Sequence, residues 1–223
     1  MKAESVRDPR LRSLPAAVAM LAAGIVVACA PAAEMDDAGT AVAPDVFVLA
    51  FETSKGDFEV EFVRAWSPLA VDRVWALARA SFWDGARLYR VNDRYAQFGY
   101  SGRPTDDANW IPAGIPDEPP LESNVRGTVS FARGGPGTRS AILFVNRGDN
   151  TNLDDLPWNG VIGFPPVGRV TSGLDVIDAL ESRYGDDVMQ WEDSISALGN
   201  PFLDRRFPGL DIIERVRVAE PDR

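Results

Sequence analysis

The sequence predicts one mostly β domain, a barrel or sandwich whose ends are covered by helices. Short segments of alternating or continuous apolar residues recur along the chain, and clusters of turn residues separate them. Only two segments have the spacing of an amphipathic helix. Apolar residues make up 45% of the 223 residues, which is enough to form a core. We expect the folded domain to span residues 46–219.

The first 28 residues have the features of a signal peptide. A basic start precedes the uncharged run Leu14–Ala28, which at fifteen residues is shorter than the roughly 20 that a membrane span needs. The residues Val26, Val27 and Ala28 stand directly before Cys29, the sole cysteine of the chain. This pattern resembles the lipobox of bacterial lipoproteins, and the resemblance implies cleavage before Cys29 and its lipidation. An ordinary cleavable signal and an uncleaved membrane anchor are the alternatives.

The segment after the signal is predicted to be a flexible tether, residues 29–45, because Ala30 to Pro44 are mainly small and have no periodicity. We therefore expect an exported protein, anchored through lipid alone on the periplasmic or cell-surface side. The whole chain has a net charge of −10. Loss of residues 1–28 would leave 19 basic against 31 acidic residues. So acidic a body would be repelled by nucleic acid, which excludes that partner.

The domain is predicted to begin with a β-hairpin. Phe47 to Thr53 is apolar and bulky, and Ser54-Lys55-Gly56 is a turn signal. Asp57 to Phe62 then alternates between acidic and apolar residues, as in a strand with one buried face.

Two helices are predicted. Ser67 can cap the first, Pro68 suits its first turn, and apolar residues at helical spacing follow until Gly85. Ser172 can cap the second, which Gly185 ends.

The remaining segments are predicted as strands and loops. The strands cover residues 88–91, 95–98, 125–132, 141–145 and 211–218. Residues 103–120 and 157–166 are expected to be irregular loops, the first of them long enough to suggest a functional loop or lid. Residues 186–203 show no clear pattern.

Several kinds of chemistry are excluded by the residues present. The chain has no histidine, so it has no histidine-assisted nucleophile and no histidine-ligated zinc. The glycine-rich segment Gly134–Gly137 lacks the lysine of a phosphate-binding loop. Acidic pairs near residues 148–155 do not have the spacing of a calcium loop. We expect no metal and no cofactor.

An ordered set of segments resembles the cyclophilin-type peptidyl-prolyl cis/trans isomerases over roughly residues 46–184. The segments are Phe82–Gly85, Leu88–Val91, Gln97–Gly99, Arg126–Ala132, Gly135–Arg139, Leu143–Asn146, Val167–Val170 and Gly173–Ile177. The resemblance implies a closed antiparallel β-barrel with two capping helices. It also implies isomerisation of proline-containing segments, here those of exported proteins, by a chain that we expect to be monomeric.

The resemblance assigns a catalytic residue and a proline pocket. Arg90 corresponds to the catalytic arginine, and Phe144 to the aromatic floor of the pocket. Gln97 corresponds to a substrate-binding glutamine if one residue is missing after Val91; otherwise Phe98 takes that place. The other predicted substrate-binding residues are Tyr95, Leu153, Ile142 and Phe164.

The sequence departs from the family pattern around this pocket. Ile142 stands where a glutamine is usual, and Arg133 where an asparagine is common. Asn152 replaces a tryptophan linked to cyclosporin binding, and Phe164 lies near a usual histidine. Two functions therefore stay open, an isomerase and a catalytically weak lipoprotein that binds peptides or proteins.

Overall fold

The computed structural model describes residues 42–219 of the chain. The predicted signal peptide 1–28, the lipidation site Cys29 and residues 30–41 of the tether lie outside the described residues. Within the last part of the predicted tether, Ala43 is buried and its amide donates to the Asp72 carboxylate at 2.9 Å. In the described part of the chain, no helix has both the length and the apolar character needed to cross a membrane.

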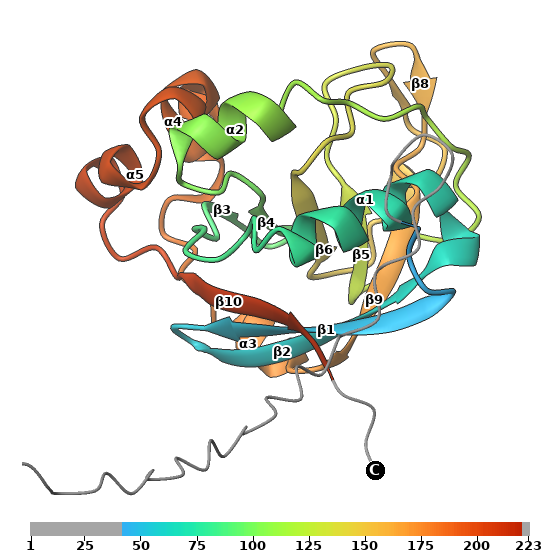
Figure 1. Cartoon of the computed structure of the whole chain (residues 1–223), viewed down its shortest axis with the longest axis horizontal. Coiled ribbons are helices and arrows are strands. Elements are labelled where there is room, and N and C mark those ends of the chain that lie inside the picture. Colours follow the sequence, from blue (N-terminus) through green and yellow to red (C-terminus); the bar gives the residue numbers. More distant parts are fainter. Residues whose placement is uncertain (1–41, 220–223) are drawn as a thin grey trace, which may run out of the picture. The chain divides into compact units, whose positions relative to one another are not determined.

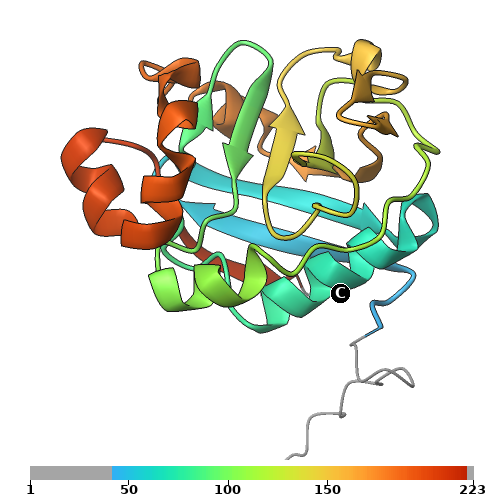
Figure 2. The same cartoon turned by 90° about the horizontal axis from the view of Figure 1, so that it is seen from above.

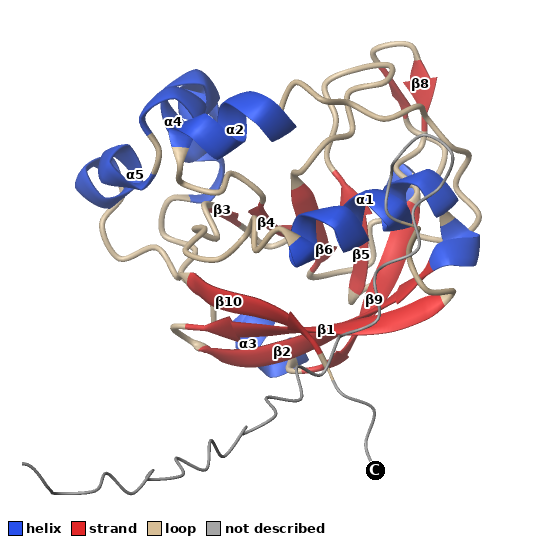
Figure 3. Cartoon of the chain, viewed as in Figure 1, coloured by secondary structure: helices blue, strands red, loops and turns tan. Residues whose placement is uncertain are grey.

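Eight antiparallel strands form one sheet, in the order β10-β1-β2-β9-β5-β6-β4-β3 (Figures 1 and 3). The strands are β1 (Val46–Thr53), β2 (Gly56–Val63), β3 (Arg90–Val91), β4 (Tyr95–Phe98), β5 (Thr128–Phe131), β6 (Leu143–Asn146), β9 (Pro166–Ser172) and β10 (Ile213–Val218). The predicted strands are therefore present, most of them shorter than expected. Strand β9 is an addition, because the sequence analysis treats residues 167–170 only as a motif.

The sheet is strongly curled, but it is a half-barrel and not the closed barrel that we expected. Its edge strands β3 and β10 do not pair with each other. The segments next to them are joined by an isolated bridge between Arg87 and Ile212 and by flanking backbone hydrogen bonds, such as the one from the Leu88 amide to the Asp211 carbonyl. These bonds do not continue into β3, which has two residues and begins beyond them, so the sheet is not closed here.

The predicted hairpin is confirmed, since β1 and β2 pair along their whole length from Val46–Val63 to Thr53–Gly56. Phe58, Val60 and Phe62 are almost completely buried, while the acidic residues between them are not. Their side chains join the main hydrophobic core, which fills the inside of the curled sheet.

The described chain contains five α-helices and not the two predicted. They are α1 (Pro68–Arg79), α2 (Pro104–Trp110), α3 (Leu174–Asp178), α4 (Glu192–Leu198) and α5 (Asn200–Arg206). The predicted helices correspond to α1 and α3, which lie on opposite sides of β1 and β2 in Figure 1. The N-cap position of α3 is Gly173 and not Ser172.

Helix α1 is capped by a residue from a distant loop. The Ser67 side chain does not cap it, contrary to the prediction. The amides of Leu69 and Ala70 instead donate to the Glu118 carboxylate at 2.8 and 3.2 Å. The same carboxylate accepts hydrogen bonds from the Ser67 hydroxyl and from the fully buried Arg139 guanidinium. A negative charge is favourable at this position because the helix N-terminus is electropositive.

The other three helices gather on one side of the domain, where α2 contacts α4 and α4 contacts α5 (Figure 2). A 3₁₀ segment, η3 (Gly185–Trp191), leads into α4. This group encloses a second hydrophobic cluster around Tyr89 and Tyr100. The expectation of a loop at 103–120 was wrong in part, because Pro104 at the start of α2 and acids in its first turn favour a helix.

Two further strands form a small hairpin where we expected an irregular loop. Strands β7 (Pro157–Trp158) and β8 (Val161–Ile162) pair with each other. The residues between them, Asn159 and Gly160, both have positive φ, as a type I′ turn requires.

Candidate functional site

A pocket of about 650 Å³ lies on the face of β4 and β6 that is turned away from the main core. Every site residue predicted from the sequence lines it, as do eleven residues that were not predicted as site residues. The predicted ones are Arg90, Tyr95, Gln97, Ile142, Phe144, Leu153 and Phe164. The eleven are Arg94, Ile111, Ala132, Gly134, Thr138, Ser140, Leu156, Trp158, Asn159, Met189 and Glu192. Arg133 and Asn152, which depart from the family pattern, complete the lining.

The strand register brings the central residues together. Arg90 in β3 is opposite Gln97 in β4, and Gln97 is opposite Phe144 in β6. Residues directly opposite each other in antiparallel strands project from the same face of the sheet. Because of this, one residue from each of three strands joins a single row across the floor of the pocket.

The register also decides which residue of β4 faces the pocket. Gln97 is opposite Arg90, whereas Phe98 packs in the main core with its ring centroid 5.6 Å from that of Phe51. In the structure, Gln97 and not Phe98 therefore faces the pocket.

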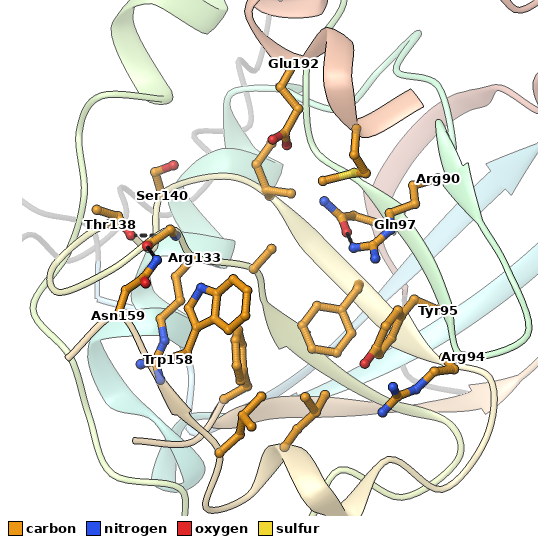
Figure 4. Close-up of a pocket in the computed structure, with 18 of the residues that line it drawn as sticks. Arg90, Arg94, Tyr95, Gln97, Arg133, Thr138, Ser140, Trp158, Asn159 and Glu192 are labelled. Atoms are coloured by element: carbon orange, nitrogen blue, oxygen red, sulfur yellow. Dashed lines mark hydrogen bonds between the residues drawn. The ribbon is translucent and has the colours of Figure 1, made fainter. Parts of the chain in front are cut away.

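The Arg90 guanidinium is held from two sides, and Figure 4 shows its contact with Gln97. Its Nη1 donates to the Gln97 side-chain oxygen at 2.9 Å, and its Nε donates to the Asp186 carboxylate at 2.6 Å. The pairing with Arg90 lowers the pKa of Asp186, although partial burial acts in the opposite direction. An arginine has five N–H donors, so three remain for a ligand.

Gln97 is itself fixed by a buried tyrosine. Its amide nitrogen donates to the Tyr89 hydroxyl at 2.6 Å, and Gln97 is only 2% exposed. Burial raises the pKa of Tyr89, so the phenol stays neutral and can accept this hydrogen bond. The amide oxygen of Gln97 is thereby directed toward Arg90.

An apolar floor lies beside the arginine. Phe144, Leu153 and Phe164 form a separate buried cluster, against which Tyr95 packs. The Phe144 ring is edge-on to those of Tyr95 and Phe164, with centroids 5.2 and 6.2 Å away. Such a surface fits a small apolar ring and excludes water from the donors next to it.

Arg133 supports this floor from below. Its guanidinium lies 4.7 Å from the centre of the Phe164 ring, donates to the Gly163 carbonyl and pairs with Asp117 at 3.3 Å. Burial lowers its pKa, and Asp117 partly offsets that effect.

Gly163 has a φ of +70°, and a Cβ there would lie 2.2 Å from the Asp154 carbonyl oxygen. The position therefore requires glycine.

The other part of the pocket comes from residues that the sequence analysis missed. Ile111 follows α2, Met189 belongs to η3 and Glu192 begins α4. Residues 186–203 carry no clear periodicity, so nothing local pointed to Met189 or Glu192. Trp158 and Asn159 belong to the β7–β8 hairpin, and the sequence signal that was overlooked is Asn159-Gly160, a strong hairpin turn.

The arrangement suits noncovalent binding of a peptide segment. It combines fixed hydrogen-bond donors with an apolar floor. Within residues 42–219, no group of three or more His, Cys, Asp or Glu side chains is placed to hold a metal ion.

Known proteins with similar sequences exist. A family model described as "Cyclophilin type peptidyl-prolyl cis-trans isomerase/CLD" matches residues 48–199. The chain is 28% identical to peptidyl-prolyl cis-trans isomerase-like 3 of Dictyostelium discoideum over 142 residues, which are 60% of this chain and 82% of that protein. It is 31% identical to the isomerase cyp18 of Streptomyces antibioticus over 135 residues, 58% of this chain and 80% of that protein.

Solved structures share the fold. The crystal structure of a cyclophilin type peptidyl-prolyl cis-trans isomerase from Cryptosporidium parvum matches with a TM-score of 0.57 and 18% identity, over 79% of this chain and 99% of that one. The structure of the same protein in the presence of the dipeptide Ala-Pro matches with a TM-score of 0.57, 17% identity and coverages of 78% and 99%. Helix α5 and strand β10 lie beyond the span of the family model.

Proposed function

Because the chain belongs to the family of cyclophilin-type peptidyl-prolyl cis-trans isomerases, we propose that it isomerises X–Pro bonds in exported proteins and so assists their folding. The observation that carries the proposal is the row of Arg90, Gln97 and Phe144, which sets a fixed cationic donor beside an apolar floor.

The reaction needs the stabilisation of one twisted state. Rotation about the prolyl amide has a barrier of about 18–20 kcal/mol, because resonance gives the C–N bond partial double-bond character. In the twisted state this resonance is lost and the proline nitrogen gains a lone pair. A free N–H of Arg90 directed at that nitrogen binds the twisted state more strongly than either planar isomer, which lowers the barrier.

The remaining residues position these two groups. Gln97 and Asp186 hold the guanidinium, so little reorganisation is needed when the twisted state forms. Phe144, with Leu153 and Phe164 around it, receives the proline ring. Gln97 and Asp186 are therefore positioning residues in this proposal, and Arg90 is the catalytic one.

The first test is isomerisation of a proline peptide by the protein, by Arg90→Ala and by Arg90→Lys. We expect a fall of about tenfold or more in kcat/KM for Arg90→Ala, which is about 1.4 kcal/mol of barrier. Arg90→Lys should recover little, because an ammonium lacks the planar fork. The control is Arg169→Ala, which removes an exposed, ion-paired arginine outside the pocket. Equal activity of Arg90→Ala and the parent would refute the assigned role.

The location belongs to the same proposal. The segment before Cys29 supports export and lipidation, with the acyl chains as the means of membrane attachment. Labelled fatty acid should enter the protein in a bacterial host and should not enter a Cys29→Ala variant. Label in both proteins would place the modification elsewhere, and label in neither would refute the lipid anchor.

A second candidate is a lipoprotein that binds peptides or a partner with little turnover. It is favoured by the Asp186 carboxylate, which already occupies Nε of Arg90, and by Ile142, which offers no polar contact to a substrate backbone. Proline peptides that bind to a folded parent without measurable turnover would favour this candidate over the enzyme.

A further inference from the structure

The part of the pocket away from the proposed proline site has three apolar residues and one acid. Ile111, Ile142 and Met189 line it, and Glu192 is the sole acidic residue of the whole pocket lining. In Figure 4 the Glu192 carboxylate points into the cavity from the end opposite Arg94. An acid at this place is not needed for holding Arg90, which has Asp186 and Gln97 as partners.

Glu192 has no cation of its own. The Tyr100 hydroxyl donates to it at 3.5 Å, and no described lysine or arginine forms an ion pair with it. Partial burial raises the pKa of Glu192, while the nearby charge of Arg90 acts in the opposite direction. A carboxylate removed from water without a paired cation is unfavourable, so a bound cation would offset that cost.

The apolar residues are linked to this carboxylate through the second hydrophobic cluster, which contains Tyr100. Ile111, Ile142 and Met189 are half-buried, and all three pack against the second hydrophobic cluster. Lysine and arginine side chains have the matching form, an aliphatic stem that covers apolar surface and a charged end. A neutral apolar side chain would contact these apolar residues but leave the carboxylate without a cation.

Resting on the isomerase function proposed above, we propose that this part of the pocket binds a lysine or arginine side chain of the substrate close to its proline. The stem lies along Ile111, Ile142 and Met189, and the charged end pairs with Glu192. The net charge of −10 adds a general attraction for cationic segments. The enzyme would thus select basic proline-containing segments. This substrate specificity is determined by residues of η3 and α4 and not by the row of Arg90, Gln97 and Phe144.

A peptide series tests this inference. Each peptide has one proline and carries lysine, norleucine or glutamate at one of the positions on either side of the proline. Norleucine keeps the stem of lysine without its charge, and the preference for lysine is measured against it. At one position we expect lysine to be preferred by about tenfold in kcat/KM. Glu192→Gln should bring this ratio close to one, and Glu192→Lys should reverse it in favour of glutamate peptides. The matched control is Glu214→Gln, which changes an exposed residue of β10 and should keep the parent ratio.

Binding of the same peptides separates this inference from the isomerase function. A lysine preference in Kd that depends on Glu192 supports the inference even if no peptide is turned over, and in that case only the isomerase function fails. The inference is overturned if no position gives a preference, if none of the peptides binds, or if the preference persists in Glu192→Gln.

Discussion

Replacement of Gln97 by leucine is the sharpest test of how the site is built. The substitution nearly conserves volume, so its effect comes from two hydrogen bonds. One is the bond from Arg90, of a kind worth about 1.5–3 kcal/mol because it involves a charge. The other is the bond to the buried Tyr89 hydroxyl, whose loss leaves that group unsatisfied at a cost of about 1–3 kcal/mol.

These costs do not add fully, because the Arg90 side chain is 23% exposed and water can replace part of its bond. We therefore expect Gln97→Leu to lower the free energy of unfolding by about 2–3 kcal/mol. In the double variant with Tyr89→Phe, about 1 kcal/mol should return, because the orphaned hydroxyl is gone. Arg90 also loses one of its two anchors, so kcat/KM should fall by about tenfold.

The coupling energy between Tyr89 and Gln97 is measured by urea unfolding of the parent, the two single variants and the double variant. The catalytic effect is measured by isomerisation of a proline peptide. Additive effects of Tyr89→Phe and Gln97→Leu would refute the idea that Tyr89 directs the glutamine amide. Unchanged turnover in Gln97→Leu would refute its role in holding Arg90.

Three other substitutions test the remaining parts of the site. Phe144→Ala should lower the unfolding free energy by about 3–5 kcal/mol and kcat/KM by at least about tenfold, because the floor is lost; a change in stability alone would contradict a binding role. Asp186→Asn should lower kcat/KM by about threefold, as expected of an exposed ion pair. The pairing with Arg90 lowers the pKa of Asp186, so the ion pair is lost only as pH falls through that lowered pKa. The ratio of kcat/KM between Asp186→Asn and the parent should therefore be constant between about pH 5 and 8. A ratio that changes in this range would contradict the role of Asp186 as the partner of Arg90. Gly163→Ala should lower the free energy of unfolding in urea by about 1–3 kcal/mol, because its φ is positive and the new Cβ would meet a backbone oxygen. Gly148→Ala is the control, because no atom would lie closer than 4.0 Å to its Cβ, and it should show no such loss of stability.

The central row could be predicted only in part from the sequence. Alternation in Tyr95–Phe98 shows that Gln97 and Phe98 point to opposite faces, but not which of them faces the pocket. That choice depends on the register with β3 and β6, which is a property of the whole sheet. The resemblance in residues 88–91 and 143–146 supplied Arg90 and Phe144, and the register then placed Gln97 between them.

The far wall of the pocket could not be predicted, for a physical reason. Helix α4 buries only Ile195, and η3 only Val188, so neither has a periodic apolar stripe. Their conformation depends on tertiary packing in the second cluster. By contrast, the β7–β8 hairpin had its Asn159-Gly160 turn in the sequence and could have been recognised.

The cap that Glu118 places on α1 has a consequence for how the domain opens locally. The carboxylate binds the amides of Leu69 and Ala70 and the buried Arg139, while the adjacent Asp117 holds Arg133 under the pocket floor. The first turn of the helix and the pocket rim are thus fastened by two neighbouring acids. A fluctuation that detaches the loop around Asp117 and Glu118 must break the contacts of both acids at once. The amide protons of the first turn of α1 and of the pocket residues around Arg133 should therefore exchange with solvent as one cooperative unit.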